Sequence, residues 1–294
     1  MKVTRIHAPD FDLEKTLNSG QVFHWEKIDN GFIGTIGDLP VYVEQREGVL
    51  KVASASSRCA AEHGQDAHAT IARYFALDHP LAEICASLPN DSVMNAARAF
   101  SRGLRIIRQP KWECLATFIC SAMKQVAHSR QISQKLRARF GEPREIDNYV
   151  VHTFPSAQRI ALVSEKELRD CALGYRARNL LATARLVATG DVDLEKMSAL
   201  SDAELQAALC QLPGVGAKVA NCVMLFAYER LRAFPIDVWI ERVLRERYFA
   251  KKRKVTPRRL RQFTESYFGE HGGYAQQYLF HHARLTRHLS APKA

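Results

Sequence analysis

The stretch LPGVGAKVANC, residues 212–222, combines a proline, two glycines two positions apart and a lysine at the start of an apolar periodicity. Before it, residues 201–204 (Ser-Asp-Ala-Glu) form a capping box that begins a helix, which the Pro-Gly pair ends. Gly216 is expected to take a positive φ in the turn, and a second helix follows it directly. The pattern predicts a helix–hairpin–helix over residues 202–229.

The expected turn has a physical reason to bind phosphate. The first N–H groups of a helix have no partner within the helix, and around Gly214 and Gly216 they favour a phosphate oxygen without contacting a base. The alternative is an ordinary tight corner between two helices, since two glycines are a weak signal on their own. A net charge of +11 over 294 residues favours a polyanionic partner, with nucleic acid first and an acidic membrane surface second.

Lys218 and Asp237 together predict a chemical site. Lys218 lies in the first turn of the second helix, where the helix dipole disfavours a protonated amine and favours a nucleophile that forms a Schiff base. Asp237, in the segment FPIDV, begins another helix and is expected to be an oriented carboxylate that backbone amides keep ionised. The alternatives are a lysine that contacts a phosphate and a plain N-cap aspartate.

The rest of the chain predicts an α+β fold. Residues 20–54 have the pattern of an antiparallel meander, with turn signals at Asp29-Asn30-Gly31 and Arg46-Glu47-Gly48. The predicted domains are a small N-terminal antiparallel β-rich domain, residues 1–90, and a larger all-α region, residues 91–294, that contains the helix–hairpin–helix. In that region Pro110 is expected to be the first residue of a helix. Further helices are predicted over residues 126–140, 164–172, 176–188, 202–211, 217–229, 238–248, 257–268 and 274–288.

Composition restricts the compartment. The first residues lack the apolar segment of a secretory signal, and no run of about 18 apolar residues predicts a membrane span. The seven cysteines are irregularly spaced without a C-x-x-C motif, as expected for reduced thiols. We therefore expect an intracellular protein of the cytoplasm and nucleoid, or of the nucleus in a eukaryote.

The segments LPGVGAKVANC and FPIDV resemble the helix–hairpin–helix, Gly/Pro-rich loop and aspartate motif of a DNA glycosylase superfamily. Within it, the chain resembles the 8-oxoguanine DNA glycosylases over residues 10–288. Four further segments carry this resemblance in the same order: LNSGQVFHW (17–25), ECLATFICSAM (113–123), LGYRARNLLATAR (173–185) and GGYAQQYLF (272–280). The resemblance implies a base-excision repair enzyme, monomeric and without metal or cofactor, that removes 8-oxoguanine from duplex DNA and cleaves the abasic site by β-elimination.

The resemblance also implies a role for each matching residue. Lys218 displaces the damaged base from C1′ and forms the imine, and Asp237 assists departure of the base. The carbonyl of Gly20 accepts the N7–H that only oxidised guanine carries. Cys222 and Phe280 hold the flipped base between them, as a base removed from the stack requires.

Three more matching residues contact the base edge or the duplex. Gln276 binds the Watson–Crick edge of the flipped base, Tyr175 enters the base stack, and Arg176 faces the orphaned partner base. Taken singly, each of these residues has an ordinary alternative as a core or surface side chain. The four segments in register are what favour the functional interpretation.

Two departures from the family pattern carry a further prediction. Met123-Lys124-Gln125 replaces a run of asparagines in the well-known members, and Trp239 replaces a histidine. Met123 still matches a DNA-binding position, but a thioether cannot provide the donors and acceptors of an amide. We therefore expect weakened discrimination of the base opposite the lesion.

Other interpretations remain open at this level. A glycosylase for alkylated bases relies on the aspartate alone, and a helix–hairpin–helix module without catalysis needs neither Lys218 nor Asp237. The basic run KKRKVTPRRLRQF, residues 251–263, is either a solvated helix entrance or a phosphate contact. The resemblance also permits a structural cation on the carbonyls of Cys210, Leu212 and Val215.

Overall fold

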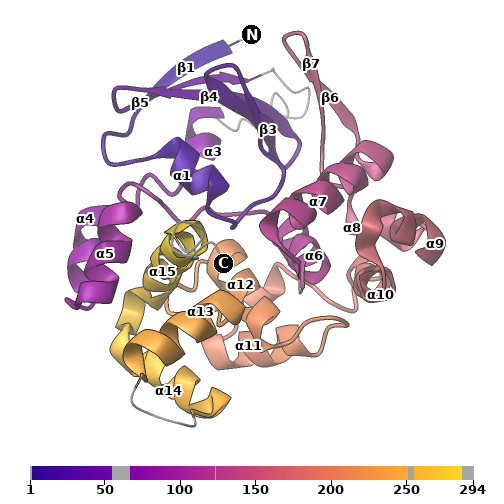
Figure 1. The fold of residues 1–294 in the computed structure, drawn as a ribbon. Helices are drawn as coiled ribbons and strands as arrows, with labels where there is room; N and C mark the ends of the chain where they lie inside the picture. Colours follow the sequence, from indigo (N-terminus) through magenta and orange to yellow (C-terminus); the bar gives the residue numbers. More distant parts are fainter. Residues whose placement is uncertain (1, 55–66, 123, 251–254, 287–294) are drawn as a thin grey trace, which may run out of the picture.

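The computed structural model describes residues 2–54, 67–122, 124–250 and 255–286. An antiparallel sheet built from the N-terminal residues lies at one end of the molecule, and helices with one short hairpin form the rest (Figure 1). Three helices in the middle carry or follow the predicted residues Lys218, Cys222, Asp237, Gln276 and Phe280: α12 (Ala217–Ala227), α13 (Val238–Val243) and α15 (Gly272–Thr286). The predicted α+β class is confirmed.

The N-terminal sheet has five strands in the order β1-β5-β4-β3-β2, all antiparallel to their neighbours. Its strands are β1 (Lys2–His7), β2 (Glu26–Ile28), β3 (Gly31–Ile36), β4 (Leu39–Arg46) and β5 (Val49–Ser54). Both predicted hairpins are confirmed, with positive φ at Asp29 (51°) and at Glu47 and Gly48 (48° and 73°). The sequence did not predict β1, because Ile6 is its only buried large apolar residue and Val3 is exposed.

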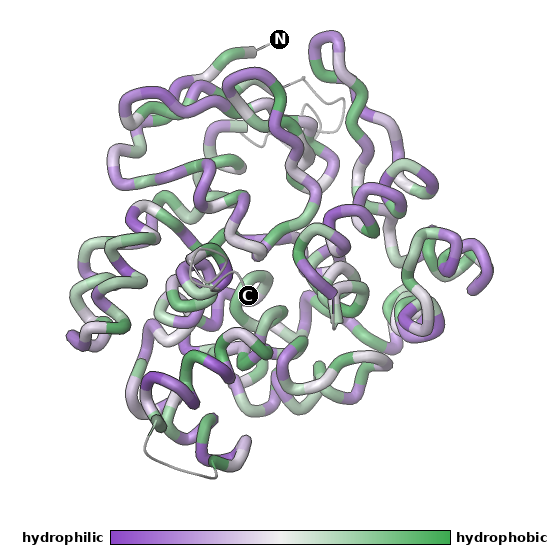
Figure 2. The backbone as a smooth tube through the Cα atoms, viewed as in Figure 1, coloured by the Kyte–Doolittle hydropathy of each residue, from purple (hydrophilic) through white to green (hydrophobic). Residues whose placement is uncertain are grey.

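Most of the predicted helices are confirmed. Besides the three central ones, the confirmed helices are α6 (Lys111–Ser121), α7 (Val126–Phe140), α9 (Glu165–Leu168), α10 (Arg176–Ala188), α11 (Asp202–Cys210) and α14 (Pro257–Tyr267). Also present are α3 (Ala67–Tyr74) and α5 (Ser92–Phe100), whose apolar residues have helical spacing, and α1 (Leu13–Asn18), α4 (Leu81–Ser87) and α8 (Ala157–Ala161), which the sequence did not predict. Pro110 caps α6 from outside instead of opening it. Figure 2 shows both hydrophobic and hydrophilic residues around the helices, as expected where each helix buries one face.

The larger region is not entirely helical, which corrects the expectation. A hairpin of β6 (Pro143–Ile146) and β7 (Tyr149–His152) lies between α7 and α8, with Asp147 at a φ of 54° in its turn. Two strands of four residues give too short an alternation to stand out between helical patterns.

Two hydrophobic cores divide the chain. The smaller lies between the sheet and α3 and includes Trp25, Phe75 and Ile107. The larger collects the apolar faces of the helices and already includes Leu81 and Ile84 of α4. The chain therefore crosses from one core to the other more than once, and the domain boundary near residue 90 stays a prediction.

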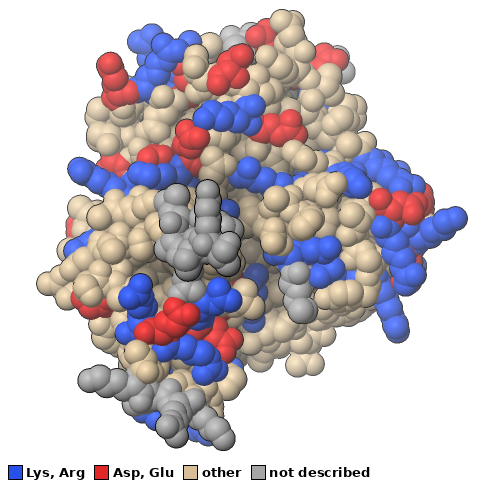
Figure 3. Space-filling model, in the orientation of Figure 1, with Lys and Arg blue, Asp and Glu red and all other residues tan. Residues whose placement is uncertain are grey.

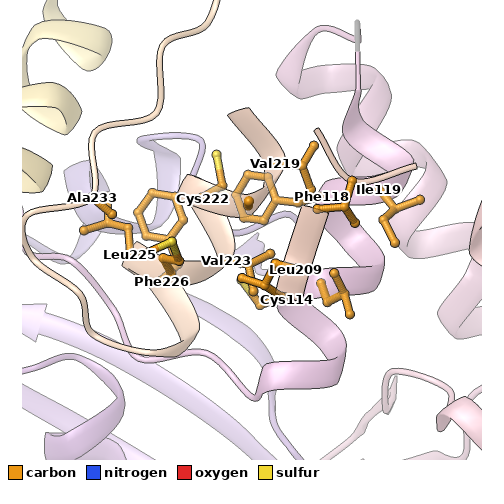
Figure 4. Packing of buried hydrophobic residues seen from close by; sticks show 14 of the residues in the cluster. Cys114, Phe118, Ile119, Leu209, Val219, Cys222, Val223, Leu225, Phe226 and Ala233 are labelled. Carbon is orange, nitrogen blue, oxygen red and sulfur yellow. The ribbon is translucent and has the colours of Figure 1, made fainter. Parts of the chain in front are cut away.

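The packing of α6 against α12 fixes the start of α12. Phe118 of α6 stacks on Phe226 of α12, with ring centroids 5.5 Å apart and an interplanar angle of 13°. Figure 4 shows Phe118 beside Val219, with Cys114 and Val223 also between the two helices. Burying each such side chain contributes about 1.5–3 kcal/mol, so packing against the apolar side chains of α6 stabilises the position of α12.

Candidate active site

The turn between α11 and α12 packs tightly against α10. The predicted capping box is confirmed, with Ser201 N donating to Glu204 Oε2 at 2.9 Å. The positive φ, however, belongs to Gly214 (83°), where an added Cβ would lie 2.8 Å from the Cβ of Asn179. Gly216 has a φ of −99° and is the N-cap of α12, so the prediction of positive φ at Gly216 is wrong. The chain reverses two residues earlier because α10 leaves no room for a side chain there.

Lys218 is the second residue of α12. The N-cap of α12 is Gly216, which has no side chain to accept from the first N–H groups of the helix. The Nζ atom of Lys218 lies 5.2 Å from the ring centroid of Phe118, which covers one side of the amine. One turn further, Cys222 is only 3% exposed. Lys218 and Cys222 therefore lie on one face of α12.

Electrostatic effects link the lysine, the thiol and the carboxylate. Burial raises the pKa of the Cys222 thiol, the Lys218 charge opposes this rise, and the charge of Asp237 adds to it. The Lys218 charge likewise acts on the carboxyl of Asp237. The Lys218 amine, the Cys222 thiol and the Asp237 carboxyl are thus close enough to act on one another's charge. The sequence analysis assigned all three residues to one site.

Asp237 caps α13 with its carboxylate. Its Oδ1 accepts hydrogen bonds from Trp239 N (3.0 Å) and Ile240 N (2.8 Å), as the sequence predicted. Burial nevertheless raises the pKa of Asp237, and the amides and Lys218 only oppose this rise. Desolvation of the carboxylate therefore outweighs the hydrogen bonds from the amides, an effect that the sequence pattern does not reveal. A carboxyl of this kind holds a proton closer to neutral pH than an exposed aspartate does.

Helix α15 packs directly on α12 and on the loop that leads to Asp237. Gly273 contacts Leu225, and its N–H donates to the carbonyl of Leu231 at 2.7 Å. Three residues further along α15, Gln276 is 4% exposed, and its buried Oε1 has no hydrogen-bond partner among the described residues. A buried acceptor without a donor is costly, so it indicates a group that a ligand satisfies.

Gly20 reaches the same region from the N-terminal part. Its φ is 87°, and an added Cβ would lie 3.0 Å from Phe280 Cε1 and 3.1 Å from Val126 Cγ2. Phe280 follows Gln276 by one turn of α15, so both side chains lie on one face of that helix. The structure thus brings Gly20 against Phe280, and places Gln276 on a helix that packs against the one carrying Lys218 and Cys222.

Comparison with known proteins identifies the family. A family model described as the 8-oxoguanine DNA glycosylase N-terminal domain matches residues 3–115, and one for the HhH-GPD superfamily of base excision DNA repair proteins matches residues 116–268. A probable N-glycosylase/DNA lyase of Methanothermobacter thermautotrophicus is 30% identical over 96% of each chain. The chain belongs to the N-glycosylase/DNA lyase family.

Two more members of the N-glycosylase/DNA lyase family support this conclusion. N-glycosylase/DNA lyase OGG1 of Arabidopsis thaliana is 32% identical and covers 92% of this chain and 77% of its own. The structure of the Clostridium acetobutylicum 8-oxoguanine glycosylase/lyase, in complex with double-stranded DNA containing cytosine opposite 8-oxoguanine, superposes with a TM-score of 0.87. It is 27% identical and covers 98% of this chain and 99% of its own. The N-glycosylase/DNA lyase family thus includes DNA-bound structures of this fold, and DNA is the partner.

The residues that the N-glycosylase/DNA lyase resemblance assigns to the duplex occupy contrasting positions. Tyr175 is 60% exposed at the start of α10, directly after Gly174, which has a φ of 58°. Arg176 is buried, and its Nε donates to the carbonyl of Ala122 at 2.7 Å. In this structure Arg176 therefore supports the backbone next to Met123, and its side chain does not extend into solvent. Met123 itself lies outside the described residues.

Sequence reasoning missed two side chains that shape the site. Phe118, which lies next to the Lys218 amine, was known only as a residue of the segment 113–123. Val126, which lies next to Gly20, was known only as the first residue of the predicted helix 126–140. Both read as core positions, since apolar spacing does not reveal which core residue faces a site. Either side chain is found only once the helices are packed.

The surface and the remaining titratable groups complete the description. Lys and Arg side chains border a recess in the face viewed in Figure 3. In the described part of the chain, no three His, Cys, Asp or Glu side chains are grouped as a metal site. Over the same residues, no helix combines the length and the apolar character that a membrane span requires.

Proposed function

We propose that this protein is a bifunctional DNA glycosylase and AP lyase that removes 8-oxoguanine from duplex DNA, with Lys218 as its nucleophile. The observation that carries the proposal is the convergence of the Lys218 amine, the Cys222 thiol and the Asp237 carboxyl within one another's electrostatic influence at the helix–hairpin–helix. A nucleophilic amine beside a carboxyl that can hold and release a proton is the pair that imine chemistry requires.

Binding of the flipped base uses the second group of residues. The base lies between Cys222 and Phe280, its N7–H donates to the carbonyl of Gly20, and its Watson–Crick edge meets Gln276. The unpartnered Oε1 of Gln276 supports this role, because an N–H on the base edge satisfies it. Tyr175 fills the space that the base leaves in the stack, and its exposure on a tight turn supports that role.

The reaction follows from these positions. The lone pair of the neutral Lys218 amine forms a bond to C1′ while the C1′–N9 bond breaks, and its electron pair leaves with the base, which takes up a proton. The amine then loses a proton as the sugar ring opens to the imine. Removal of a C2′ proton breaks the C3′–O bond and releases the 3′ phosphate. Asp237 exchanges protons during these steps, and its raised pKa suits that task.

The proposal includes the state and location of the protein. We propose a monomer that acts on oxidised guanine in the cytoplasm and nucleoid, or in the nucleus of a eukaryote. The cysteines of the described part are all free, which supports a reducing compartment.

Borohydride trapping on 8-oxoguanine duplexes tests the assignment. Reduction of the imine is expected to give a covalent protein–DNA adduct with the wild type, and none with Lys218→Gln, which should still bind DNA. Lys196→Gln is the matched control, because that lysine is 87% exposed and lies on another surface segment. An undiminished adduct with Lys218→Gln would contradict the nucleophile, and a wild type that forms no adduct with any lesion would contradict the function.

A further inference from the structure

The segment of residues 17–21, here called the Gly20 loop, begins with the last two residues of α1 and is held from both parts of the molecule. Ser19 and Gln21, on either side of Gly20, are completely buried. The Gln21 side chain binds the segment before α6: it donates to the carbonyl of Arg105 at 2.8 Å and accepts from Ile107 N at 2.9 Å. One flank of Gly20 is thus anchored to the chain segment between the two cores.

The other flank is held by helices of the larger region in addition to local bonds, in which the Ser19 hydroxyl donates to the carbonyl of Thr16 and accepts from Gln21 Nε2. Nε2 of Gln277, a residue 2% exposed on α15, donates to the carbonyl of Ser19 at 3.0 Å. Arg284 of α15 donates to the carbonyl of Asn18 at 2.6 Å, and Arg130 of α7 donates to the Asn18 side chain at 2.6 Å. Three side chains from two helices therefore converge on the two residues that precede Gly20.

Holding the Gly20 loop with Arg130 and Arg284 costs free energy, because both guanidinium groups are partly buried. Burial lowers the pKa of Arg130, and burial together with the charge of Arg130 lowers the pKa of Arg284. Neither guanidinium forms an ion pair within the described part of the chain, and the Nε of each is buried without a hydrogen-bond partner there. Two neighbouring cations without a carboxylate do not serve general stability, so their carbonyl contacts indicate a local task.

We propose that Gln277, Arg130 and Arg284 position the carbonyl of Gly20 for the lesion, and so set the rate at which oxidised guanine is excised. The inference rests on the proposed function, which makes that carbonyl the acceptor of the N7–H. A glycine at a φ of 87° has no Cβ to restrict it, so its carbonyl direction depends on how the flanking peptides are held. Misplacement by about 1 Å is enough to slow a reaction strongly.

The test uses two reactions of the same protein. Single-turnover excision of 8-oxoguanine requires the Gly20 carbonyl, whereas strand cleavage at a preformed abasic site requires Lys218 and its proton exchange with Asp237 but no contact to a damaged base. Gln277→Leu keeps most of the side-chain volume but removes the N–H group that donates to the carbonyl of Ser19. We expect excision to slow about tenfold, the equivalent of one hydrogen bond, with cleavage of the abasic duplex unchanged.

A second pair of variants guards against a folding defect at the buried glutamine. Arg284→Met should slow excision selectively, and Arg284→Lys, which keeps a donor near the Asn18 carbonyl, should restore most of it. Arg46→Ala is the charge-matched control, since Arg46 is 71% exposed at the end of β4. It should affect both reactions equally and slightly.

The outcomes separate this inference from the function on which it rests. Equal losses in both reactions, or unchanged excision in Gln277→Leu and Arg284→Met, would overturn the positioning role while leaving the glycosylase intact. A wild type that cleaves abasic DNA but excises no 8-oxoguanine would overturn the proposed substrate and the positioning role together.

Discussion

Asp237 illustrates how burial and hydrogen bonding compete on a single carboxyl. Two backbone amides and a nearby ammonium favour its ionised form, yet desolvation is the larger effect and raises its pKa. In the folded state this group therefore binds a proton more readily than in the unfolded chain. Its contribution to stability is present at low pH and is lost as pH rises through the raised value, so the ionised carboxylate destabilises the fold at neutral pH.

Replacing Asp237 with asparagine should separate activity from stability. The amide keeps an oxygen for the N-cap but cannot carry protons, so we expect excision to slow by about 100-fold. The melting temperature at pH 7 should rise or stay the same, because no buried charge remains. The acid limb of the wild-type rate profile, expected above the ordinary carboxyl value of 3.8, should disappear in the variant. A clear loss of thermal stability at neutral pH would argue against the balance described here.

The segment Met123-Lys124-Gln125 carries a prediction about the opposite strand. Because this segment replaces the run of asparagines that the family resemblance implies, we expect a polar contact to an opposite cytosine to be missing, and discrimination should be weak. Excision rates on duplexes with C, A, G or T opposite 8-oxoguanine are expected to differ by less than about 100-fold. A difference of that size corresponds to the discrimination that one or two bidentate contacts to a base provide. A preference for cytosine beyond that range would show that other residues contact the partner base.

At the scale of elements, the two glycines of the hairpin should respond differently to alanine. Gly214→Ala places a Cβ 2.8 Å from that of Asn179 at a φ of 83°, and should lower the free energy of unfolding by about 1–3 kcal/mol. Gly216→Ala meets no atom within 4 Å and has an ordinary φ, so only a weaker N-cap is expected, about 1 kcal/mol or less. Urea denaturation of both variants measures the difference, and the reverse order would place the tight turn at Gly216.

The sequence predicts elements better than their contacts. The capping box at Ser201 and the turns at Asp29 and Glu47 follow from local chemistry, and all three are confirmed. The positive φ was misplaced at Gly216 because either glycine satisfies a turn locally. Only the approach of Asn179 from α10, a long-range contact, decides between them.

The site has the same limit. Lys218 and Asp237 were found from helix ends, whereas the raised pKa of Asp237 has no sequence signal, because burial is a property of the packed molecule. Gln277 is adjacent to Gln276 in the sequence, yet nothing local distinguishes a side chain that faces a base from one that holds a loop. The distinction appears only when Ser19, far away in sequence, meets α15.

At the scale of the whole molecule, a charged network joins the segment after α3 to the end of α12. Glu229 Oε1 lies 2.7 Å from His79 Nε2 and accepts a hydrogen bond from Arg108, which also binds Asp78. His79 in turn lies 2.8 Å from the hydroxyl of Tyr274 on α15. The network therefore connects both helices of the candidate site to the N-terminal part.

Acid should weaken this connection in a defined range. The bonds to His79 and Arg108 lower the pKa of Glu229 from 4.5 to about 2, so its stabilisation is present above the unfolded value and is lost as pH falls through about 2. Glu229 is 38% exposed, and solvent screening reduces the effect of Glu229→Gln at pH 7 to about 1 kcal/mol. Urea denaturation at pH 7 and at about pH 3 (roughly the middle of the transition between the two pKa values) should show the difference from wild type shrinking. A difference that does not depend on pH would point to a packing effect of the substitution.

The Gly20 loop and helix α12 belong to segments matched by different family models, residues 3–115 and 116–268. The atom proposed to recognise damage and the atom proposed to cut the glycosidic bond are therefore inherited on separate portions of the chain. A substitution near Gly20, or in the side chains that hold the Gly20 loop, can then change lesion preference during evolution while Lys218 and Asp237 remain unchanged.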